Sequence, residues 1–383
     1  MATAYAPRTG AGLGTMRRNP ASAWRHVDAT LVFCTLAVSL LGAVMVYSAT
    51  RGPVPPYDTE LATKQLLFVG IGVVVMAVCA VVDYRKIRDF TIPIFAAVMV
   101  LLLAVLTPLG SARKGTQAWF QIGAFQLQPS ELAKLALILG LAALAASYKG
   151  EIDVRRLTAL LGLSAIPFGL IMLQPDLGTA IVLVAIVMGV LLVAGVRVRH
   201  ILALTLIGVS GVIAVLNSGN LEDYQRDRLT AFLDQEADLQ ASTYNLAQSK
   251  IAIGAGGLLG AGLFDGAQTK GDYVPEQHTD FIFTVVGEEL GFVGSALLLL
   301  LFALLMWRTW RTAQLARDFY GTLICVGVLA FLTFQVFQNV GMTMGIMPIT
   351  GIPLPFMSYG GSSTITDFAA LGLVLNVHMR RFA

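Results

Sequence analysis

The chain of 383 residues is 56% hydrophobic and only 13% charged, with a formal net charge of +3. A water-soluble chain carries about 25% charged residues, so this composition and a mean hydropathy of +0.74 exclude an ordinary soluble globular protein. Such a small net charge gives no indication of a nucleic-acid partner. The cysteines Cys34, Cys79 and Cys325 lie apart within apolar segments, which argues against disulfides and against a thiolate metal site.

Long apolar runs recur along the chain, and as helices they are long enough to cross the roughly 30 Å hydrocarbon core of a bilayer. Residues 1–28 precede the first run and, being rich in Ala, Gly, Arg and Pro, indicate a cytoplasmic tail. Residues 29–381 are expected to form one all-α, polytopic membrane domain with about ten transmembrane helices, and one large extracytoplasmic loop, about 217–279, between spans 7 and 8. The predicted spans are about 29–49, 63–82, 91–109, 130–147, 157–173, 177–196, 200–216, 280–306, 319–344 and 357–378.

Lysine and arginine are divided unequally between the two sets of alternating loops, and the cytoplasmic loops are the ones that carry the excess. Both ends of the chain belong to the richer set, so both termini are expected to be cytoplasmic. The outer face then receives the loop 110–129, the turn 174–176 and the long loop 217–279. The basic residues of the cytoplasmic set are Arg8, Arg17, Arg18, Arg25, Arg85, Lys86, Arg88, Lys149, Arg155, Arg156, Arg197, Arg199, Arg308, Arg311, Arg317, Arg380 and Arg381.

Ionisable side chains inside predicted spans cost at least a few kcal/mol each, so they indicate a functional cavity by default. Glu131 and Lys134 lie three residues apart on one helical face and can neutralise each other. The alternative for this pair is a purely structural role. Asp176 follows a proline at the mouth of a span, where a carboxylate either caps the next helix or takes part in chemistry.

Asp280 stands at the outer end of the eighth predicted span. At about 100° per residue, Thr284, Gly287 and Gly291 fall on the same helical face, and we expect this small, polar face to line a cavity. Glu288 is about 80° from Asp280 around the helix, so it is expected to share that cavity.

The long loop adds further candidates. Glu276 and His278, together with Asp280, offer ligands that suit Mg²⁺ or Mn²⁺, so a divalent-cation site is one alternative, and a solvated loop end is another. The sequence itself requires no cofactor. The glycine-rich segment 253–268 has no G-x-G-x-x-G pattern, and it indicates either a re-entrant loop or a backbone concavity for phosphate. Lys250 is an outer-loop cation for phosphate or for lipid head groups.

Five motifs stand out in the chain: "QPSELAKLALIL", "QPDLGTA", "YNLAQSKIAIGAGGLLGAGLFDGAQ", "VPEQHTDFIFTVVGEELGF" and "NVGMTMGIMPITGIPLPFMSYGGSS". Together they resemble the SEDS family, the shape, elongation, division and sporulation proteins of bacterial cell walls, over about residues 29–381. Three shorter stretches, "QSKIAIG", "GAQT" and "MTMGIMPITGIPLPFMSYGGSS", look more like the elongation member RodA than the division member FtsW. The segment 231–245 lacks the Pro and Gly that often follow its Asp in the family.

The resemblance implies a peptidoglycan glycosyltransferase that polymerises lipid II on the outer face of the bacterial cytoplasmic (inner) membrane. It also implies a partner, a class B penicillin-binding transpeptidase, besides the membrane lipids. By motif match, Asp280 is the position tied to catalysis. The expected cavity and substrate-binding residues are Glu131, Lys134, Asp176, Lys250, Glu276, His278, Glu288 and Ser358.

Glycan extension needs a general base for the acceptor hydroxyl, and we assign this role to Asp280. The leaving pyrophosphate needs cationic stabilisation, for which Lys134 is the intramembrane candidate. A single displacement of this kind inverts the donor configuration. A flippase for lipid II is the first alternative, since many spans with buried charges also describe transporters. A scaffold for the partner transpeptidase is the second.

Overall fold

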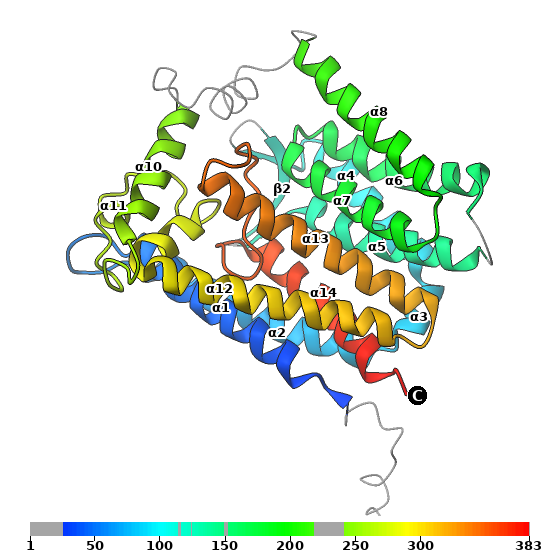
Figure 1. Cartoon of the computed structure of the whole chain (residues 1–383), viewed down its shortest axis with the longest axis horizontal. Helices are drawn as coiled ribbons and strands as arrows, with labels where there is room; N and C mark the ends of the chain where they lie inside the picture. The colour runs from blue at the N-terminus through cyan, green and yellow to red at the C-terminus, as the bar shows by residue number, and fades with distance from the viewer. Residues whose placement is uncertain (1–25, 114–115, 124, 149–151, 218–240, 383) are drawn as a thin grey trace, which may run out of the picture.

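The structure is a computed structural model that describes residues 26–113, 116–123, 125–148, 152–217 and 241–382. Most of the predicted tail 1–28 and residues 218–240 of the predicted loop 217–279 therefore lie outside the described residues. Figure 1 shows that the described chain is a bundle of long helices, most of which run along its longest axis. The fold is that of a mostly helical, polytopic membrane protein.

Most of the helices coincide with the predicted apolar runs. Six are long and apolar enough to cross a membrane, namely α1 (Ala29–Thr50), α2 (Glu60–Val81), α5 (Pro129–Ser147), α6 (Val154–Met172), α12 (Ile282–Leu315) and α13 (Phe319–Thr343). Apolar but shorter stretches occur in α4 (Thr91–Val105), α7 (Leu177–Val193) and α8 (Val198–Asn217). The remaining helices are α3 (Tyr84–Asp89), α10 (Ala241–Gly256), α11 (Ala267–Lys270) and α14 (Gly361–Met379). The expected count of ten spans stays a prediction.

A small antiparallel sheet occupies the predicted loop 110–129, so the all-α expectation was wrong in this detail. Its strands are β1 (Ser111–Arg113), β2 (Thr116–Ile122) and β3 (Phe125–Leu127), in the order β1-β2-β3. The stretch around Trp119 mixes aromatic, β-branched and polar residues, as strands do. Ile122 pairs with Phe125, and Gly123 between them has φ +60°, which suits the tight turn of a hairpin.

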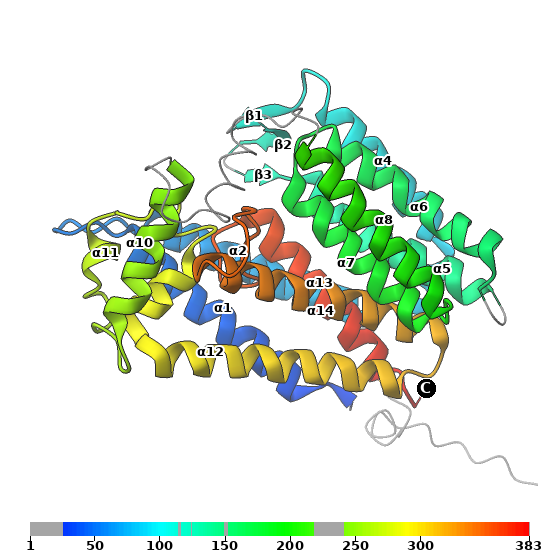
Figure 2. The ribbon, with the colours of Figure 1, turned by 45° about the horizontal axis from the view of Figure 1, so that its top comes forward.

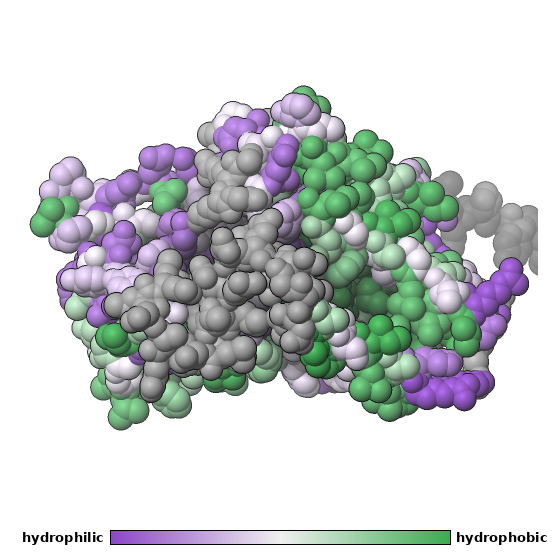
Figure 3. Space-filling view, turned by 90° about the horizontal axis from the view of Figure 1, so that it is seen from above, coloured by the Kyte–Doolittle hydropathy of each residue, from purple (hydrophilic) through white to green (hydrophobic). Residues whose placement is uncertain are grey.

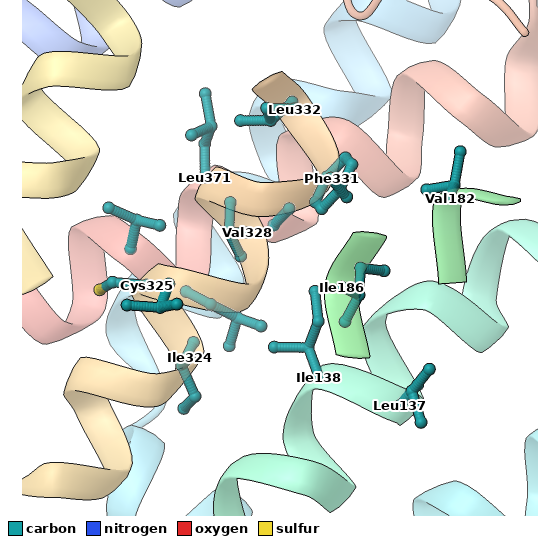
Figure 4. Packing of buried hydrophobic residues seen from close by; sticks show 14 of the residues in the cluster. Leu137, Ile138, Val182, Ile186, Ile324, Cys325, Val328, Phe331, Leu332 and Leu371 are labelled. Carbon is teal, nitrogen blue, oxygen red and sulfur yellow. The ribbon is translucent and has the colours of Figure 1, made fainter. Parts of the chain in front are cut away.

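The core lies where α13 meets α5 and α7 on one side and α14 on the other (Figure 2). Figure 4 shows Ile138 of α5 and Ile186 of α7 close to Val328 and Phe331 of α13, and all four are fully buried. A Cβ at Gly327 would lie 2.9 Å from the Ile138 side chain, so this glycine permits the close approach of α5 and α13. Close packing of this kind drives helix association in lipid, where the hydrophobic effect between helices is lost.

The two ends of the described chain lie together. Figure 1 shows the start of α1 and the C-terminus at the same end of the bundle, and the rings of His26 and Phe382 are 5.0 Å apart. The described ends of the chain, residues 26 and 382, therefore lie at one end of the bundle, and the cytoplasmic location of both termini stays a prediction.

The outer surface has the character expected of a lipid-facing bundle. In Figure 3 hydrophobic residues cover the half that carries α4, α6 and α8, and hydrophilic residues gather toward α10 and α11. On α8, Leu202, Leu206 and Ile207 are each more than half exposed. Exposed apolar side chains in a continuous patch of this kind indicate contact with lipid.

Candidate active site

Asp280 lies in the turn just before α12, which begins at Ile282, and its side chain is half-buried. The Asn339 amide on α13 donates a hydrogen bond of 2.7 Å to the Asp280 carbonyl and another of 2.8 Å to the Ile352 carbonyl. Asn339 is itself buried. The backbone of Asp280 is thus tied to two other parts of the bundle while its carboxylate stays partly accessible.

The residues before Asp280 are fixed in the same way. The Tyr359 N–H donates a 2.9 Å hydrogen bond to the His278 carbonyl, and the two rings lie 5.9 Å apart. Glu276 has φ +59°, and its carboxylate accepts a 3.0 Å hydrogen bond from the Thr279 hydroxyl in the same turn. The segment 276–280 is therefore held against the loop that leads into α14.

The side chains that could have bound a divalent cation, those of Glu276, His278 and Asp280, do not come together. Glu276 is turned to Thr279, and the His278 ring faces Tyr359. Over the described part of the chain, no three His, Cys, Asp or Glu side chains form a group that could hold a metal ion. Glu276, His278 and Asp280 thus do not assemble a divalent-cation site in this conformation.

Glu131 and Lys134 form the ion pair that their spacing predicts. The carboxylate oxygen lies 2.7 Å from the ammonium nitrogen, and the side chains are 5% and 1% exposed. The ammonium also lies 5.4 Å from the centre of the Phe331 ring on α13. A charged pair this deeply buried is stable only because each partner compensates the other.

A third buried charge, Asp367 on α14, accompanies this pair and was missed by the sequence reasoning. Its side chain is 2% exposed and accepts a 3.4 Å hydrogen bond from the Phe356 N–H. Lys134 and Glu131 are near enough to act on this carboxyl electrostatically. The signal was present in the sequence, because Asp367 stands inside an apolar run where a carboxylate is costly.

Asp176 caps α7, one of its two predicted roles. Its carboxylate accepts hydrogen bonds from the Thr179 N–H (3.0 Å) and the Thr179 hydroxyl (2.7 Å). It also accepts from Gln128 and Ser130 at the start of α5, both at 3.3 Å. Asp176 therefore joins the N-terminal ends of α5 and α7.

The start of α14 meets the same place. The Ser362 hydroxyl accepts a 3.0 Å hydrogen bond from the Gln128 N–H and donates one of 2.7 Å to the Gln126 carbonyl. Three helix N-termini, those of α5, α7 and α14, are thus linked by side chains. Each carries a partial positive charge from its backbone N–H groups, which favours an anion.

The predicted cavity face of the eighth span is covered, which corrects that expectation. The Thr284 hydroxyl bonds at 2.7 Å to Ser249 of α10, and a Cβ at Gly256 would lie only 2.0 Å from the Gly287 carbonyl. Because Gly287 and Gly291 lack side chains, α10 and the residues after it come into backbone contact with α12. The small residues serve helix packing, as in other membrane interfaces.

Gly291 interrupts α12 with φ +64° and ψ −164°, so backbone N–H and C=O groups on either side of it lack partners within the helix. The glycine-rich segment 257–262 forms hydrogen bonds with these groups. It donates from Ala261 to the Glu288 carbonyl (2.9 Å) and accepts at Gly257 from the Phe292 N–H (2.9 Å). The glycine-rich segment therefore completes the hydrogen bonds of a broken helix, which a membrane helix requires.

Glu288 does not extend from the break toward open space. Its carboxylate accepts hydrogen bonds from the N–H groups of Gln268 (2.7 Å) and Thr269 (2.9 Å), and from the Thr269 hydroxyl (2.7 Å). It is 1% exposed. Glu288 thus anchors the loop at α11 to the interior of the bundle.

Two further expected residues lie in contrasting surroundings. Lys250 is exposed on α10. Ser358 is 2% exposed, and its hydroxyl accepts a 2.8 Å hydrogen bond from the Leu354 N–H. The Ser358 carbonyl accepts a 3.1 Å hydrogen bond from Gln65 on α2. In this conformation Ser358 shapes the loop before α14.

Comparison with known proteins identifies the family. The family model described as "Cell cycle protein", which covers FtsW, RodA and SpoVE, matches residues 28–382. The chain belongs to the SEDS family. Stage V sporulation protein E of Bacillus subtilis is 42% identical to this SEDS protein over 356 residues, which cover 91% of this chain and 96% of that protein. Peptidoglycan glycosyltransferase MrdB of Escherichia coli is 35% identical over 356 residues, with coverage of 93% and 94%.

Solved structures agree with this assignment. A chain of a peptidoglycan synthase complex superposes with a TM-score of 0.80 at 34% identity and covers 94% of this SEDS protein and 99% of that chain. RodA of Thermus thermophilus gives a TM-score of 0.71 at 33% identity, with coverage of 94% and 99%. The match to RodA agrees with the RodA-like interpretation, although SpoVE and FtsW proteins are also among the relatives.

Proposed function

We propose that this SEDS protein is a peptidoglycan glycosyltransferase that polymerises lipid II into glycan strands, for cell elongation and shape. Relatives from E. coli and from Geobacter carry the name peptidoglycan glycosyltransferase, at 35% identity and over nine-tenths of this chain. The observation that carries the mechanism is the position of Asp280, a half-buried carboxylate fixed through its backbone by Asn339.

Asp280 acts as the general base in this proposal. It takes the proton from the acceptor sugar hydroxyl as that oxygen attacks the anomeric carbon of the pyrophosphate-linked donor. The bond from the anomeric carbon to the pyrophosphate oxygen breaks in the same displacement. Attack from the face opposite the leaving group inverts the configuration, and no covalent enzyme intermediate forms.

In this proposal Lys134 stabilises the leaving pyrophosphate. Lys134 contacts Phe331, and Asp280 contacts Asn339, eight residues further along the same helix. At 1.5 Å per residue the two contact points are about 12 Å apart along the axis.

The location follows from the same proposal. Both termini lie at one end of the bundle, and the lysine and arginine excess assigns that end to the cytoplasm. The protein then crosses the bacterial cytoplasmic membrane about ten times, and α10, α11 and Asp280 lie on the outer face. A class B penicillin-binding transpeptidase is the proposed partner, since one structural relative is a chain of a peptidoglycan synthase complex.

The break of α12 at Gly291 favours one rival, a lipid II flippase, because interrupted helices are typical of transporters. One experiment distinguishes the glycosyltransferase from the flippase. The purified protein in liposomes receives fluorescent lipid II, and polymer on a gel is measured beside the movement of lipid between leaflets. We expect polymer. Movement of lipid II without polymer, with and without the partner transpeptidase, would replace this proposal by the flippase.

A further inference from the structure

A pocket of about 180 Å³ lies at the end of the bundle where both termini meet, far along α12 from Asp280. It is formed by the last turns of α12 and the end of α14, which lie side by side in Figures 1 and 2. Its lining is unusually basic and comprises Arg308, Arg311, Thr312, Leu315, His378 and Arg381. The proposed transferase chemistry does not use any of these residues.

The fold itself neutralises one of the three arginines. Arg308 donates to a single carboxylate oxygen of Asp28 from Nε (2.8 Å) and from Nη2 (2.5 Å). The other Asp28 oxygen caps α1 by accepting from the Leu31 N–H at 3.1 Å. Asp28 is therefore fully occupied, and the Arg308 charge is compensated.

His378 adds no positive charge, as its hydrogen bonds indicate. The Thr312 hydroxyl donates to the Arg308 carbonyl (2.9 Å) and lies 3.2 Å from His378 Nδ1. Nη1 of Arg381, a group that can only donate, lies 2.6 Å from His378 Nε2 and 3.1 Å from Nδ1, and the Asp28 carboxylate is 3.9 Å from Nδ1. A guanidinium this close to both ring nitrogens favours the neutral imidazole.

Two arginines remain without a carboxylate partner among the described residues. Arg311 is exposed and stacks at 5.5 Å from the Trp307 ring. Arg381 contacts the neutral His378, and its Nε is buried without a hydrogen-bond partner. The neighbouring Arg380, by contrast, is used by the fold, because it donates to the Ala80 and Val81 carbonyls. A buried unpaired guanidinium nitrogen is costly unless a ligand completes it.

The sequence offers no intramolecular anion upstream to fill the pocket. Residues 1–25 contain Arg8, Arg17, Arg18 and Arg25 but neither Asp nor Glu. The segment that precedes α1 therefore supplies no acidic side chain, and a planar guanidinium pair is the recognition group that suits phosphate.

The surroundings identify the source of that phosphate as lipid. Trp307 and Trp310 are 49% and 43% exposed beside the pocket, and Leu315 in its lining is 46% exposed. Exposed tryptophans flanked by arginines are typical of the boundary between hydrocarbon and head groups. We propose that this pocket binds the phosphate of an anionic phospholipid in the leaflet on the side of the termini. The inference needs membrane insertion but not the transferase activity.

The test compares two double variants with the same change of charge. Arg311→Gln with Arg381→Gln empties the pocket of its two uncompensated charges. Arg155→Gln with Arg317→Gln is the matched control, because both arginines are exposed and belong to the same predicted cytoplasmic set. Native mass spectrometry then measures retention of phosphatidylglycerol and of phosphatidylcholine with the same acyl chains.

We expect the pocket variant to lose retention of phosphatidylglycerol by at least about tenfold, because it loses the charge-assisted hydrogen bonds from two guanidinium groups to the phosphate. The control should change less than about twofold, and phosphatidylcholine should not distinguish the proteins. An equal loss in both double variants would overturn the proposal in favour of diffuse attraction to the membrane. Displacement of the lipid by an equal concentration of glycerol phosphate would show a site for a soluble phosphate and would overturn the lipid assignment.

The unmodified protein provides the test if the pocket variant does not fold. Phosphatidylglycerol should raise its apparent Tm in detergent more than phosphatidylcholine does at the same concentration. Identical shifts for the two lipids would contradict a phosphate-binding pocket.

Discussion

Lys134→Met should destabilise this protein more than Glu131→Gln does. Lys134 is the cation that faces two buried carboxylates, its 2.7 Å partner Glu131 and the more distant Asp367. Loss of Glu131 leaves Lys134 with Asp367 as a compensating charge. Loss of Lys134 leaves two buried carboxyl groups, those of Glu131 and Asp367, without a cation in a region of low dielectric constant, which is the more costly arrangement.

The magnitudes follow from the burial of the pair. Removal of one partner of a buried ion pair costs about 3–5 kcal/mol. We assign the lower end, about 3 kcal/mol, to Glu131→Gln and the upper end, about 5 kcal/mol, to Lys134→Met. The double variant removes both charges of the pair, so it should lie within about 2 kcal/mol of the unmodified protein, well short of the sum.

The assay is thermal unfolding in detergent, followed by intrinsic fluorescence, with polymerisation of lipid II measured on the same samples. A difference of about 2 kcal/mol between the single variants corresponds to a difference of several degrees in apparent Tm. Equal losses for the two single variants, or a double variant whose loss equals their sum, would refute the charge arrangement. A double variant that is stable but inactive would assign Lys134 to the pyrophosphate.

Three further predictions concern the packing of α10 and α11 against α12. Gly256→Ala should separate α10 from α12 and cost about 1–3 kcal/mol of stability in the same unfolding assay, because its Cβ would lie 2.0 Å from the Gly287 carbonyl. Gly254→Ala is the control and should be close to neutral, because nothing lies within 4 Å of its Cβ. Glu288→Gln should weaken the three hydrogen bonds to Gln268 and Thr269 and increase proteolysis between 262 and 276, and unchanged proteolysis would count against an anchoring role. Gly291→Ala should strain the positive φ at the break of α12 and reduce both stability and polymerisation, and a variant as stable as the parent would mean that the break is not required.

The long apolar helices could be predicted from hydropathy, because a bilayer demands apolar runs of a set length, whereas α3, α10 and α11 could not. The ion pair of Glu131 and Lys134 could be predicted as well, since a spacing of three residues fixes neighbours on a helix. The cap at Asp176 was one of two roles that the preceding proline suggests. Each of these features depends on residues close together in the sequence, so a local sequence pattern is enough to predict it.

The remaining features depend on contacts between distant segments. No helical wheel predicts that the face of Thr284 and Gly287 is covered by α10, because that requires the position of a second helix. The role of Glu288 likewise depends on α11, about twenty residues away in the chain. Asn339 is missed because a single amide in an apolar span carries no motif, and its importance appears only once Asp280 lies beside it.

The most direct test of the central claim is the initial rate at which purified protein polymerises lipid II when Asp280 is changed to Asn. The amide keeps the shape of the side chain but cannot accept the proton, so we predict a rate lower by a factor of about 10²–10⁴. Asp265→Asn is the matched control, because this exposed carboxylate of the same loop is paired with Lys270 at 2.8 Å, and its rate should be close to that of the parent. A near-normal rate for a folded, membrane-inserted Asp280→Asn protein would contradict the account and remove Asp280 from the role of base.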